Sequence, residues 1–420
     1  MATYTESQGL AREPSLFDSF KKGLRTSGVP WLFVAPAIII MIFITFLPQL
    51  FQIYVAFRDF GVQHLTGAVP APYVGLDNFV KVLTDGLNVP NYNFFPLLGF
   101  NIFWTFTNVA LHVIIGLAVA LALNTEGLIG RPVYRVLYVI PWALPGYISA
   151  LIWNNLWQQN GGGINLLLAE VNRWFGTSIR TNTPWLTSIQ YPIDLRWLVP
   201  WLIIVGGGAV TVWLVLRLRR LGLRNARTGL LDTSRVVWSF GLIILLGLSA
   251  VFTLLDVLRD GASASNAVIQ LFDRAGAPVL AFYAVLAANV WLGWPFMMVV
   301  ATGALQSIPK DLYEAADVDG ATRIQRLRFI TLPLLRPAMV PAIMLGTIWT
   351  FNQFNVIFFI TAGGPRGQTN LLITQAYILI QQEQLYGVAA AFSIIVFFVL
   401  FVLTLITNSI TRATKAYDEA

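Results

Sequence analysis

The chain has 420 residues, of which 56% are hydrophobic and only 11% are charged, whereas a soluble domain carries roughly 25% charged residues. This composition excludes an ordinary soluble protein, and the net charge of +7 does not indicate nucleic-acid binding because the basic residues form short clusters between apolar runs. The absence of cysteine excludes disulfides, thiolate metal sites and cysteine nucleophiles, and two histidines are too few for most metal centres.

Eight apolar segments are long enough to cross a bilayer, which takes roughly 20 residues of helix. They lie at 30–57, 97–123, 133–157, 197–216, 236–257, 279–306, 337–361 and 387–411. The sequence therefore predicts an all-α fold, a polytopic bundle of about eight transmembrane helices. The first apolar run is long and lacks a small-residue cleavage site, so we expect an uncleaved anchor.

The distribution of basic residues predicts the orientation. Most of the 27 Lys and Arg residues fall on one side of the membrane if the N-terminus is cytoplasmic. They lie in the tail 1–29, at Arg131 and Arg135, in 217–235, in 310–336 and in the tail 412–420. Cytoplasmic loops carry an excess of Lys and Arg. We therefore expect a multi-pass membrane protein with both termini in the cytoplasm.

One section differs from its surroundings. It holds a glycine-rich turn at Gly161, two apolar segments joined by an arginine-rich loop, and a polar Ser/Asn stretch. We interpret 158–278 as an inserted loop and helical hairpin. It separates three helices in 30–157 from three core helices in 279–411.

Polar and helix-breaking residues occur at mid-depth in several spans. His112 follows Asn108 by one turn, but a lone histidine among apolar residues is usually packed and hydrogen-bonded rather than catalytic. Since no acid, base or metal ligand converges on it, we expect no enzyme activity. Proline removes a hydrogen bond from the helix ladder. We therefore expect Pro141 and Pro145 to break the third span, and Trp294-Pro295 to break the sixth.

A charged loop separates the sixth and seventh spans. Pro309 and Asp311 should start a short helix, because acidic residues suit the first turn, and Gly320 should end it. Ala321–Ile330 should form a second helix, which Pro333 stops. The two helices make either a knob that another protein grips or an interfacial connection between two spans.

The seventh span carries three amides at its centre, at Asn352, Gln353 and Asn355. Amides in lipid must face protein or water, so they either line a cavity or form hydrogen bonds between helices. Three amides beside aromatic residues, level with the proline breaks, favour a cavity. Other tryptophans are expected to anchor spans at the lipid interface, namely Trp31, Trp104, Trp153 and Trp201.

The loop at 307–336 resembles the EAA loop of ABC importer permeases. In that pattern Glu-Ala-Ala is followed after three residues by Gly, and nine residues later by Ile-x-Leu-Pro. Every element is present at this spacing, as Glu314, Ala315, Ala316, Gly320, Ile330, Leu332 and Pro333. The resemblance implies a coupling helix that sits in a cleft of an ATPase subunit and passes its closure to the pore.

Further stretches resemble the maltose-type sugar permeases, including Tyr73-Val-Gly-Leu-Asp-Asn-Phe and Trp291-Leu-Gly-Trp-Pro. The resemblance implies a six-helix type I importer core, with the hairpin added, that moves a sugar or oligosaccharide by alternating access. It implies a substrate site at Trp142, Gly146, Leu292, Gly293, Phe296, Trp349, Thr350 and Gln353. The maltose pattern has Tyr at 142 and 296 and Asn at 350 and 353, so the identity of the sugar does not carry over.

The resemblance also implies a location in the bacterial inner membrane, and it implies partners. The chain has no Gly-Lys dipeptide and so no phosphate-binding loop, which assigns ATP and Mg²⁺ to a separate ATPase. We expect a second permease subunit, two ATPase subunits and an extracytoplasmic sugar-binding protein or lipoprotein, in addition to membrane lipid. The alternative is a secondary, ion-coupled transporter. Such a carrier normally places a carboxylate at mid-depth, whereas the carboxylates of these spans lie at the ends.

Overall fold

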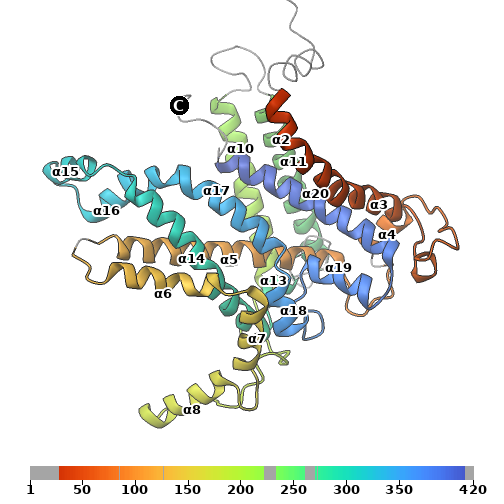
Figure 1. Cartoon of the computed structure of the whole chain (residues 1–420), viewed down its shortest axis with the longest axis horizontal. Helices are drawn as coiled ribbons and strands as arrows, with labels where there is room; N and C mark the ends of the chain where they lie inside the picture. The colour runs from red at the N-terminus through yellow and green to blue at the C-terminus, as the bar shows by residue number, and fades with distance from the viewer. Residues whose placement is uncertain are drawn as a thin grey trace, which may run out of the picture.

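The computed structural model describes residues 28–84, 86–125, 127–221, 233–260, 270–271 and 273–411. Within these ranges the elements are helices, and the β-structure is limited to one isolated bridge between Arg58 and Tyr73 (Figure 1). The predicted all-α fold is therefore confirmed. The predicted tails, 1–29 and 412–420, lie outside the described residues except for the first two residues of the first helix.

The helices of the first part of the chain, up to the end of the hairpin, are α2 (Gly28–Met41), α3 (Leu47–Ala56), α4 (Asp77–Leu83), α5 (Phe94–Leu123), α6 (Arg131–Ala143), α7 (Gly146–Leu156), α8 (Gly163–Phe175), α9 (Val199–Trp201), α10 (Gly208–Leu221) and α11 (Thr233–Asp260). Those of the second part are α13 (Asp273–Gly276), α14 (Leu280–Gln306), α15 (Asp311–Val318), α16 (Arg323–Arg326), α17 (Leu332–Phe351), α18 (Asn355–Thr361), α19 (Leu372–Gln381) and α20 (Tyr386–Thr411). Seven helical stretches in the described ranges are long and apolar enough to cross a membrane, or up to eight if the bent pair α6–α7 is one span. This agrees with the eight predicted segments.

Helices α5 and α14 form the centre of the bundle, and α17 packs against both. Their backbones approach closely because small residues lie at the contact. A Cβ atom added to Gly116 of α5 would lie 2.7 Å from Cβ of Met297 and 2.8 Å from the carbonyl oxygen of Trp294, both on α14. Helix α6 packs on α14, and α7 packs on α18. Helices α6, α7, α17 and α18 thus pack around α14 at the centre of the molecule.

The bend in the third span occurs at Pro145. Helix α6 ends at Ala143, α7 begins at Gly146, and the two are bent by 89°. Leu144 between them is extended, with φ −78° and ψ 141°, as a residue before proline prefers. Pro141 lies inside α6, so the prediction that it also breaks the span is wrong.

The predicted break at Trp294-Pro295 is also wrong, because α14 runs through it without interruption. Met297 and Met298, which follow the proline, are almost fully buried. Packing on α5, α6 and α17 holds α14 helical, which outweighs the local preference of the residue before proline.

The loop between the sixth and seventh spans contains the two expected helices. The first, α15, ends at Val318. Gly320 follows its C-cap residue and has a φ of +72°, the left-handed conformation that favours glycine. The second, α16, does not stop at Pro333. It continues through a π-helical turn, Leu327–Thr331, into α17, where the proline occupies the first turn. Proline is tolerated there because a first-turn N–H has no partner within the helix.

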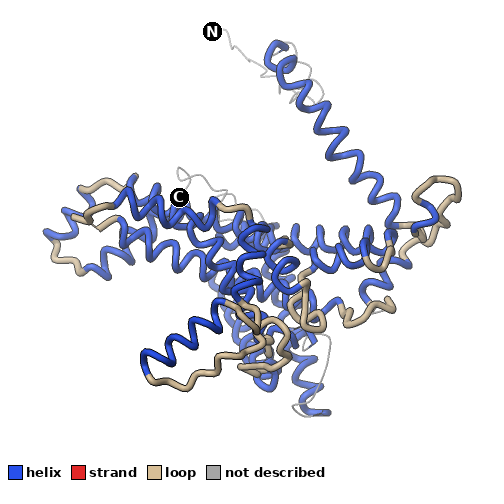
Figure 2. Tube along the Cα trace, turned by 60° about the horizontal axis from the view of Figure 1, so that its bottom comes forward, coloured by secondary structure: helices blue, strands red, loops and turns tan. Residues whose placement is uncertain are grey.

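The first span projects from the bundle. Helix α3 packs against α20, whereas α2 rises away from the other helices (Figure 2). Within the first span, Phe33–Ala56, none of the 18 residues of the most hydrophobic stretch is buried by the rest of the chain. Phe33, for example, is 79% exposed. In a membrane, this surface faces lipid or another subunit.

The inserted hairpin packs chiefly on itself, through α10, α11 and the π-helical turn Leu202–Gly207. Gly207 lies close to the carbonyl oxygen of Leu246, where an added Cβ would be 3.4 Å away. The chain enters and leaves this region at one place, since the N–H of Leu195 donates to the carbonyl oxygen of Gly276 at 2.8 Å. The boundaries at 158 and 278 stay a prediction.

The topology prediction concerns the bent pair α6–α7. We expect it to cross the membrane, because Arg131 and Arg135 at its start favour the cytoplasmic side. The chain has no cysteine, so Thr125→Cys and Gln159→Cys each introduce a single thiol. A membrane-impermeant maleimide applied from outside should label the second and not the first. Labelling of both from the same side would show that the pair re-enters instead of crossing.

Candidate functional site

A cavity of about 240 Å³ lies where α5, α6–α7, α14 and α17 meet. It is lined by all eight residues that the sequence assigns to substrate binding, Trp142, Gly146, Leu292, Gly293, Phe296, Trp349, Thr350 and Gln353. His112, Leu144, Asn289, Met297 and Gly346 also line it. The structure thus brings together residues from four segments of the chain. Their role in binding stays a prediction.

One wall of the cavity is aromatic. The ring of Phe296 lies between two indoles, with centroids 5.9 Å from Trp142 and 5.4 Å from Trp349. Trp142 is 47% exposed and Trp349 is 52% exposed. Flat aromatic faces offer a large apolar contact to a ligand that carries C–H groups.

A chain of amides reaches the cavity through Asn289 and Gln353. Nε2 of Gln353 donates to Oδ1 of Asn289 at 2.8 Å, and Nδ2 of Asn289 donates to Oδ1 of Asn108 at 2.7 Å. Nδ2 of Asn108 donates to the carbonyl oxygen of Trp104 at 2.8 Å. Asn108 and Asn289 are almost completely buried. The chain therefore pairs amides of α5, α14 and the seventh span where water is excluded.

The seventh span is broken beside this chain, between the end of α17 at Phe351 and the start of α18 at Asn355. The break leaves carbonyl groups at the end of α17 without a helical partner. Nε1 of Trp104 donates to the carbonyl oxygen of Thr350 at 3.3 Å. Nδ2 of Asn101 donates to that of Phe351 at 3.2 Å. Side chains on one face of α5 thus donate hydrogen bonds to the free carbonyl groups of the broken helix.

The three amides of the seventh span differ in role. Gln353 lines the cavity and also bonds to another helix, so both interpretations of this residue hold. Asn352 instead donates to its own helix, at the carbonyl oxygen of Ile348. Asn355 is exposed and does not line the cavity.

His112 is packed and hydrogen-bonded, as predicted. Its Nε2 lies 3.0 Å from the backbone oxygen of Asn289, which can only accept, so Nε2 carries the hydrogen. The ring lies against Gly293, where an added Cβ would be 2.2 Å from Cε1 of the histidine. Glycine at 293 is therefore the residue that leaves room for the imidazole at the cavity wall.

Sequence reasoning missed Asn101 and Asn289, and it placed Trp104 wrongly. Trp104 is fully buried instead of anchoring α5 in lipid, because Thr350 offers its indole N–H an acceptor inside the bundle. A signal was present in the sequence. Asn101, Trp104, Asn108 and His112 are spaced by three, four and four residues, which places them on one helical face.

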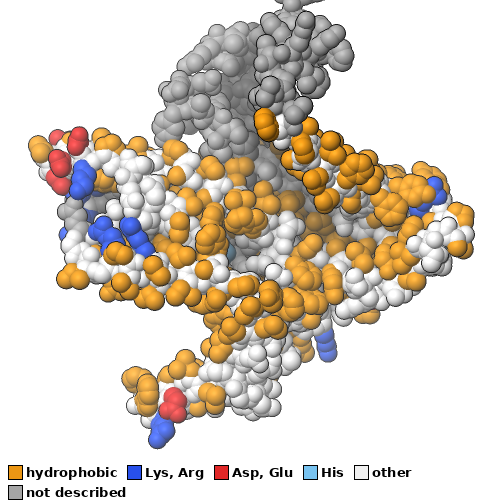
Figure 3. All heavy atoms as spheres, viewed as in Figure 1, with side chains coloured by type: hydrophobic (Ala, Val, Ile, Leu, Met, Phe, Trp, Pro, Cys, Tyr) orange, Lys and Arg blue, Asp and Glu red, His pale blue; other side chains and the backbone are white. Residues whose placement is uncertain are grey.

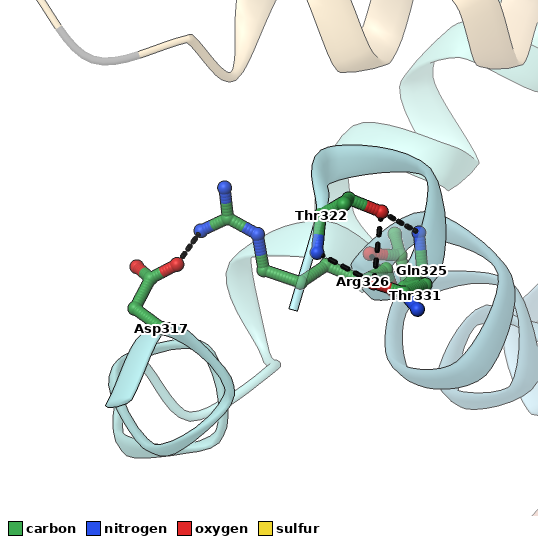
Figure 4. Close-up of polar contacts among 5 residues, drawn as sticks. All are labelled: Asp317, Thr322, Gln325, Arg326 and Thr331. Atoms are coloured by element: carbon green, nitrogen blue, oxygen red, sulfur yellow. Dashed lines mark hydrogen bonds and ion pairs between the residues drawn. The ribbon is translucent and has the colours of Figure 1, made fainter. Parts of the chain in front are cut away.

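The loop of α15 and α16 is held by polar contacts (Figure 4). The carboxylate of Asp317 pairs with the guanidinium of Arg326 at 2.5 Å. Thr322 caps α16, since its Oγ1 accepts from the backbone N–H of Gln325 at 3.4 Å, and its own N–H donates to Oε1 of Gln325 at 2.7 Å. The hydroxyl of Tyr313 lies 3.0 Å from Oγ1 of Thr331, which adds a second link between α15 and the start of the seventh span.

The residues of the Glu-Ala-Ala pattern lie at the outer surface of this loop. Glu314 and Ala315 are exposed, and Ala316 is half-buried. Figure 3 shows charged side chains gathered at this end of the molecule, whereas the helices beyond it present a largely apolar surface. Among the pattern's later residues, Ile330 and Pro333 are half-buried and Leu332 is exposed. Their role in coupling stays a prediction.

Comparison with known proteins agrees with the predicted resemblance. Residues 237–415 match the family described as binding-protein-dependent transport system inner membrane component. The galactooligosaccharides transport system permease protein of Bacillus subtilis (strain 168) is 27% identical over 400 residues, which covers 94% of this chain and 72% of the relative. The trehalose/maltose transport system permease protein of Thermococcus litoralis is 26% identical over 388 residues, covering 92% of this chain and 95% of the relative.

A solved structure has a similar fold. It is the crystal structure of a bacterial ABC transporter involved in the import of the acidic polysaccharide alginate. The similarity has a TM-score of 0.60 at 17% identity and covers 95% of this chain and 100% of the other. At this identity the comparison supports the fold of the helical bundle.

The contact between Gly293 and His112 gives a prediction about stability. Gly293→Ala should lower the thermal unfolding temperature of the detergent-solubilised protein, since overpacking typically costs about 1–3 kcal/mol. Gly303→Ala is the matched control, because Gly303 lies on the same helix with no atom within 4 Å of an added Cβ. It should be neutral or stabilising. Adding His112→Ala to Gly293→Ala should restore part of the loss; an equal loss in both glycine variants would contradict this packing.

Proposed function

This chain carries the inner membrane component domain of binding-protein-dependent transport systems, and from this premise we propose that it forms half of the pore of an ATP-driven sugar importer. The observation that carries the proposal is the single cavity lined by all eight residues expected to bind sugar. Relatives named as permeases for galactooligosaccharides and for trehalose or maltose support a sugar or oligosaccharide as substrate. They favour this function over the alternative, an ion-coupled carrier.

The chemistry of the cavity suits a neutral sugar. Amide and hydroxyl groups hydrogen-bond sugar hydroxyls, and indole faces take the apolar C–H face of a pyranose. Gln353 and Thr350 supply the first kind of contact, and Trp142 and Trp349 supply the second. At about 240 Å³ the cavity is slightly smaller than typical small-molecule sites, which span roughly 300–1,000 Å³. A second permease subunit would complete the pore.

The loop of α15 and α16 is the proposed contact with an ATPase. Glu314 and Ala315 are exposed there, and Gly320 sets the sharp turn between the two helices. Closure of two ATPase subunits on ATP would push this loop, while the helical path from α16 to α17 leads to the cavity. The chain's own residues bind and orient the sugar; ATP and Mg²⁺ belong to the ATPase partners.

The proposed assembly contains this chain, a second permease, two ATPase subunits and an extracytoplasmic sugar-binding protein or lipoprotein. A binding protein is supported by the family description and by a solved alginate transporter in complex with its periplasmic protein. Both termini are proposed to lie in the cytoplasm.

The reconstituted complex should hydrolyse ATP faster when a sugar-loaded binding protein is added. A panel of maltose, trehalose and galactobiose tests the substrate class.

Substitutions in the cavity test the substrate site. Trp349→Ala and Gln353→Ala should each lower the maximal rate of sugar uptake severalfold, because a neutral hydrogen bond or an aromatic contact contributes about 1 kcal/mol. Co-purification of the ATPase should be unchanged. Trp201→Ala is the control, since Trp201 is also about half exposed but lies in the inserted region. Wild-type uptake by both cavity variants would show that the sugar binds elsewhere.

The ion pair in the coupling loop gives a separate prediction. Asp317→Asn should lower the amount of sugar moved per ATP by up to about fivefold, since a half-exposed pair contributes at most about 1 kcal/mol. The double variant Asp317→Arg/Arg326→Asp should recover most of the loss because it restores the pair. Asp319→Asn, which removes a charge from the same loop, is the control. A reversed pair that couples no better than Asp317→Asn would mean that the contact does not hold the loop.

A further inference from the structure

The amide chain beside the cavity has a direction that is fixed at one end. The carbonyl oxygen of Trp104 can only accept, so the group of Asn108 that faces it must be the NH₂ group. The oxygen of Asn108 is then left to accept from Asn289, whose own oxygen accepts from Gln353. Each amide in turn is held in one of its two possible orientations.

The other end of the chain returns to the same residue, at the indole of Trp104. The backbone N–H of Gln353 donates to the carbonyl oxygen of Thr350 at 3.3 Å, and that oxygen also accepts from Nε1 of Trp104 at 3.3 Å. The hydrogen bonds therefore close into a ring through Trp104, Asn108, Asn289, Gln353 and Thr350. The ring is buried at Trp104 and Asn108, and it meets the cavity at Asn289, Thr350 and Gln353.

A glutamine amide that can rotate by 180° presents either an oxygen or an NH₂ group to a ligand. Rotation of Gln353 would place its Oε1 against Oδ1 of Asn289, two acceptors facing each other. Nε2 keeps a second N–H besides the one given to Asn289. Among the described residues no hydrogen bond reaches Oε1, so Oε1 is the acceptor that this orientation offers to a ligand.

We infer that the ring locks the orientation of the Gln353 side chain at the cavity wall, so that the substrate group that meets Oε1 must be a hydroxyl acting as donor. Asn108 and Asn289 act as positioning residues, because they set the orientation of Gln353 from outside the cavity or at its edge. The inference rests on the proposed function, and it adds a rule for discriminating substrates. A sugar with fluorine or an ether oxygen at that position would be rejected.

The experiment compares uptake of the transported sugar of the panel with uptake of its monodeoxyfluoro derivatives. Wild-type complex should discriminate against the derivative at one position by about fivefold or more, as expected for one lost hydrogen bond. Asn108→Leu frees Asn289 and Gln353 to rotate, so this discrimination should shrink toward unity. Asn155→Leu is the matched control, because Asn155 donates to the carbonyl oxygen of Leu151 within its own helix, outside the ring.

Asn108→Asp is the conservative variant. It keeps an oxygen for Asn289 and, when protonated, an O–H for Trp104, so the discrimination should be retained. Discrimination that persists in Asn108→Leu, or that is lost equally in Asn155→Leu, would overturn the inference.

A double-mutant cycle on thermal unfolding tests the ring without a substrate. Asn108→Leu and Asn289→Leu should be non-additive, because each removes the hydrogen bond between the two amides. Additive effects would overturn the ring and leave the proposed function intact. If no sugar is taken up by the wild-type complex, the proposed function fails and the inference fails with it.

Discussion

A helix that is broken inside a membrane must have its free backbone groups satisfied by protein, because the bilayer core offers no water. This constraint determines the centre of the molecule. The seventh span breaks after Phe351, and the carbonyl groups at the end of α17 are taken up by Asn101 and Trp104 of α5. The same face of α5 continues to Asn108 and His112. The cavity exists where this polar face, the break and the bend at Pro145 meet.

Features that depend on the average properties of many residues, such as the hydropathy of a whole span, were predicted correctly from the sequence. Hydropathy located the spans, and the short-helix signals at Asp311 and Gly320 located α15 with the left-handed glycine that follows it. Predictions based on a single residue, such as a helix break at a proline, were correct less often. Pro145 breaks its span, whereas Pro295 does not, because α14 is packed against α5, α6 and α17. Pro333 lies in the first turn of α17, directly after the π-helical turn Leu327–Thr331. The neighbouring sequence does not reveal that the proline occupies this position in the helix.

The candidate site was predicted by resemblance to a known pattern, which gave the residues that face the cavity. The residues behind them were not found, because Asn101 and Asn289 act through neighbours distant in sequence. Their partners are 250 and 64 positions away along the chain. The first span and the inserted hairpin pack largely outside this centre. Changes in those parts can therefore accumulate without altering the walls of the cavity.

The uninterrupted path from α16 into α17 has a mechanical consequence. The helical path from Arg323 to Phe351 has 29 residues (351 − 323 + 1), which at roughly 1.5 Å per residue is about one and a half times the thickness of a bilayer core. Before Phe351 this path is helical throughout, although it contains a π-helical turn and three prolines, Pro333, Pro337 and Pro341. The break at Asn352–Phe354 is its first interruption. A force applied at the loop of α15 and α16 would be carried along this helix to the break, where Gln353 lies at the cavity wall.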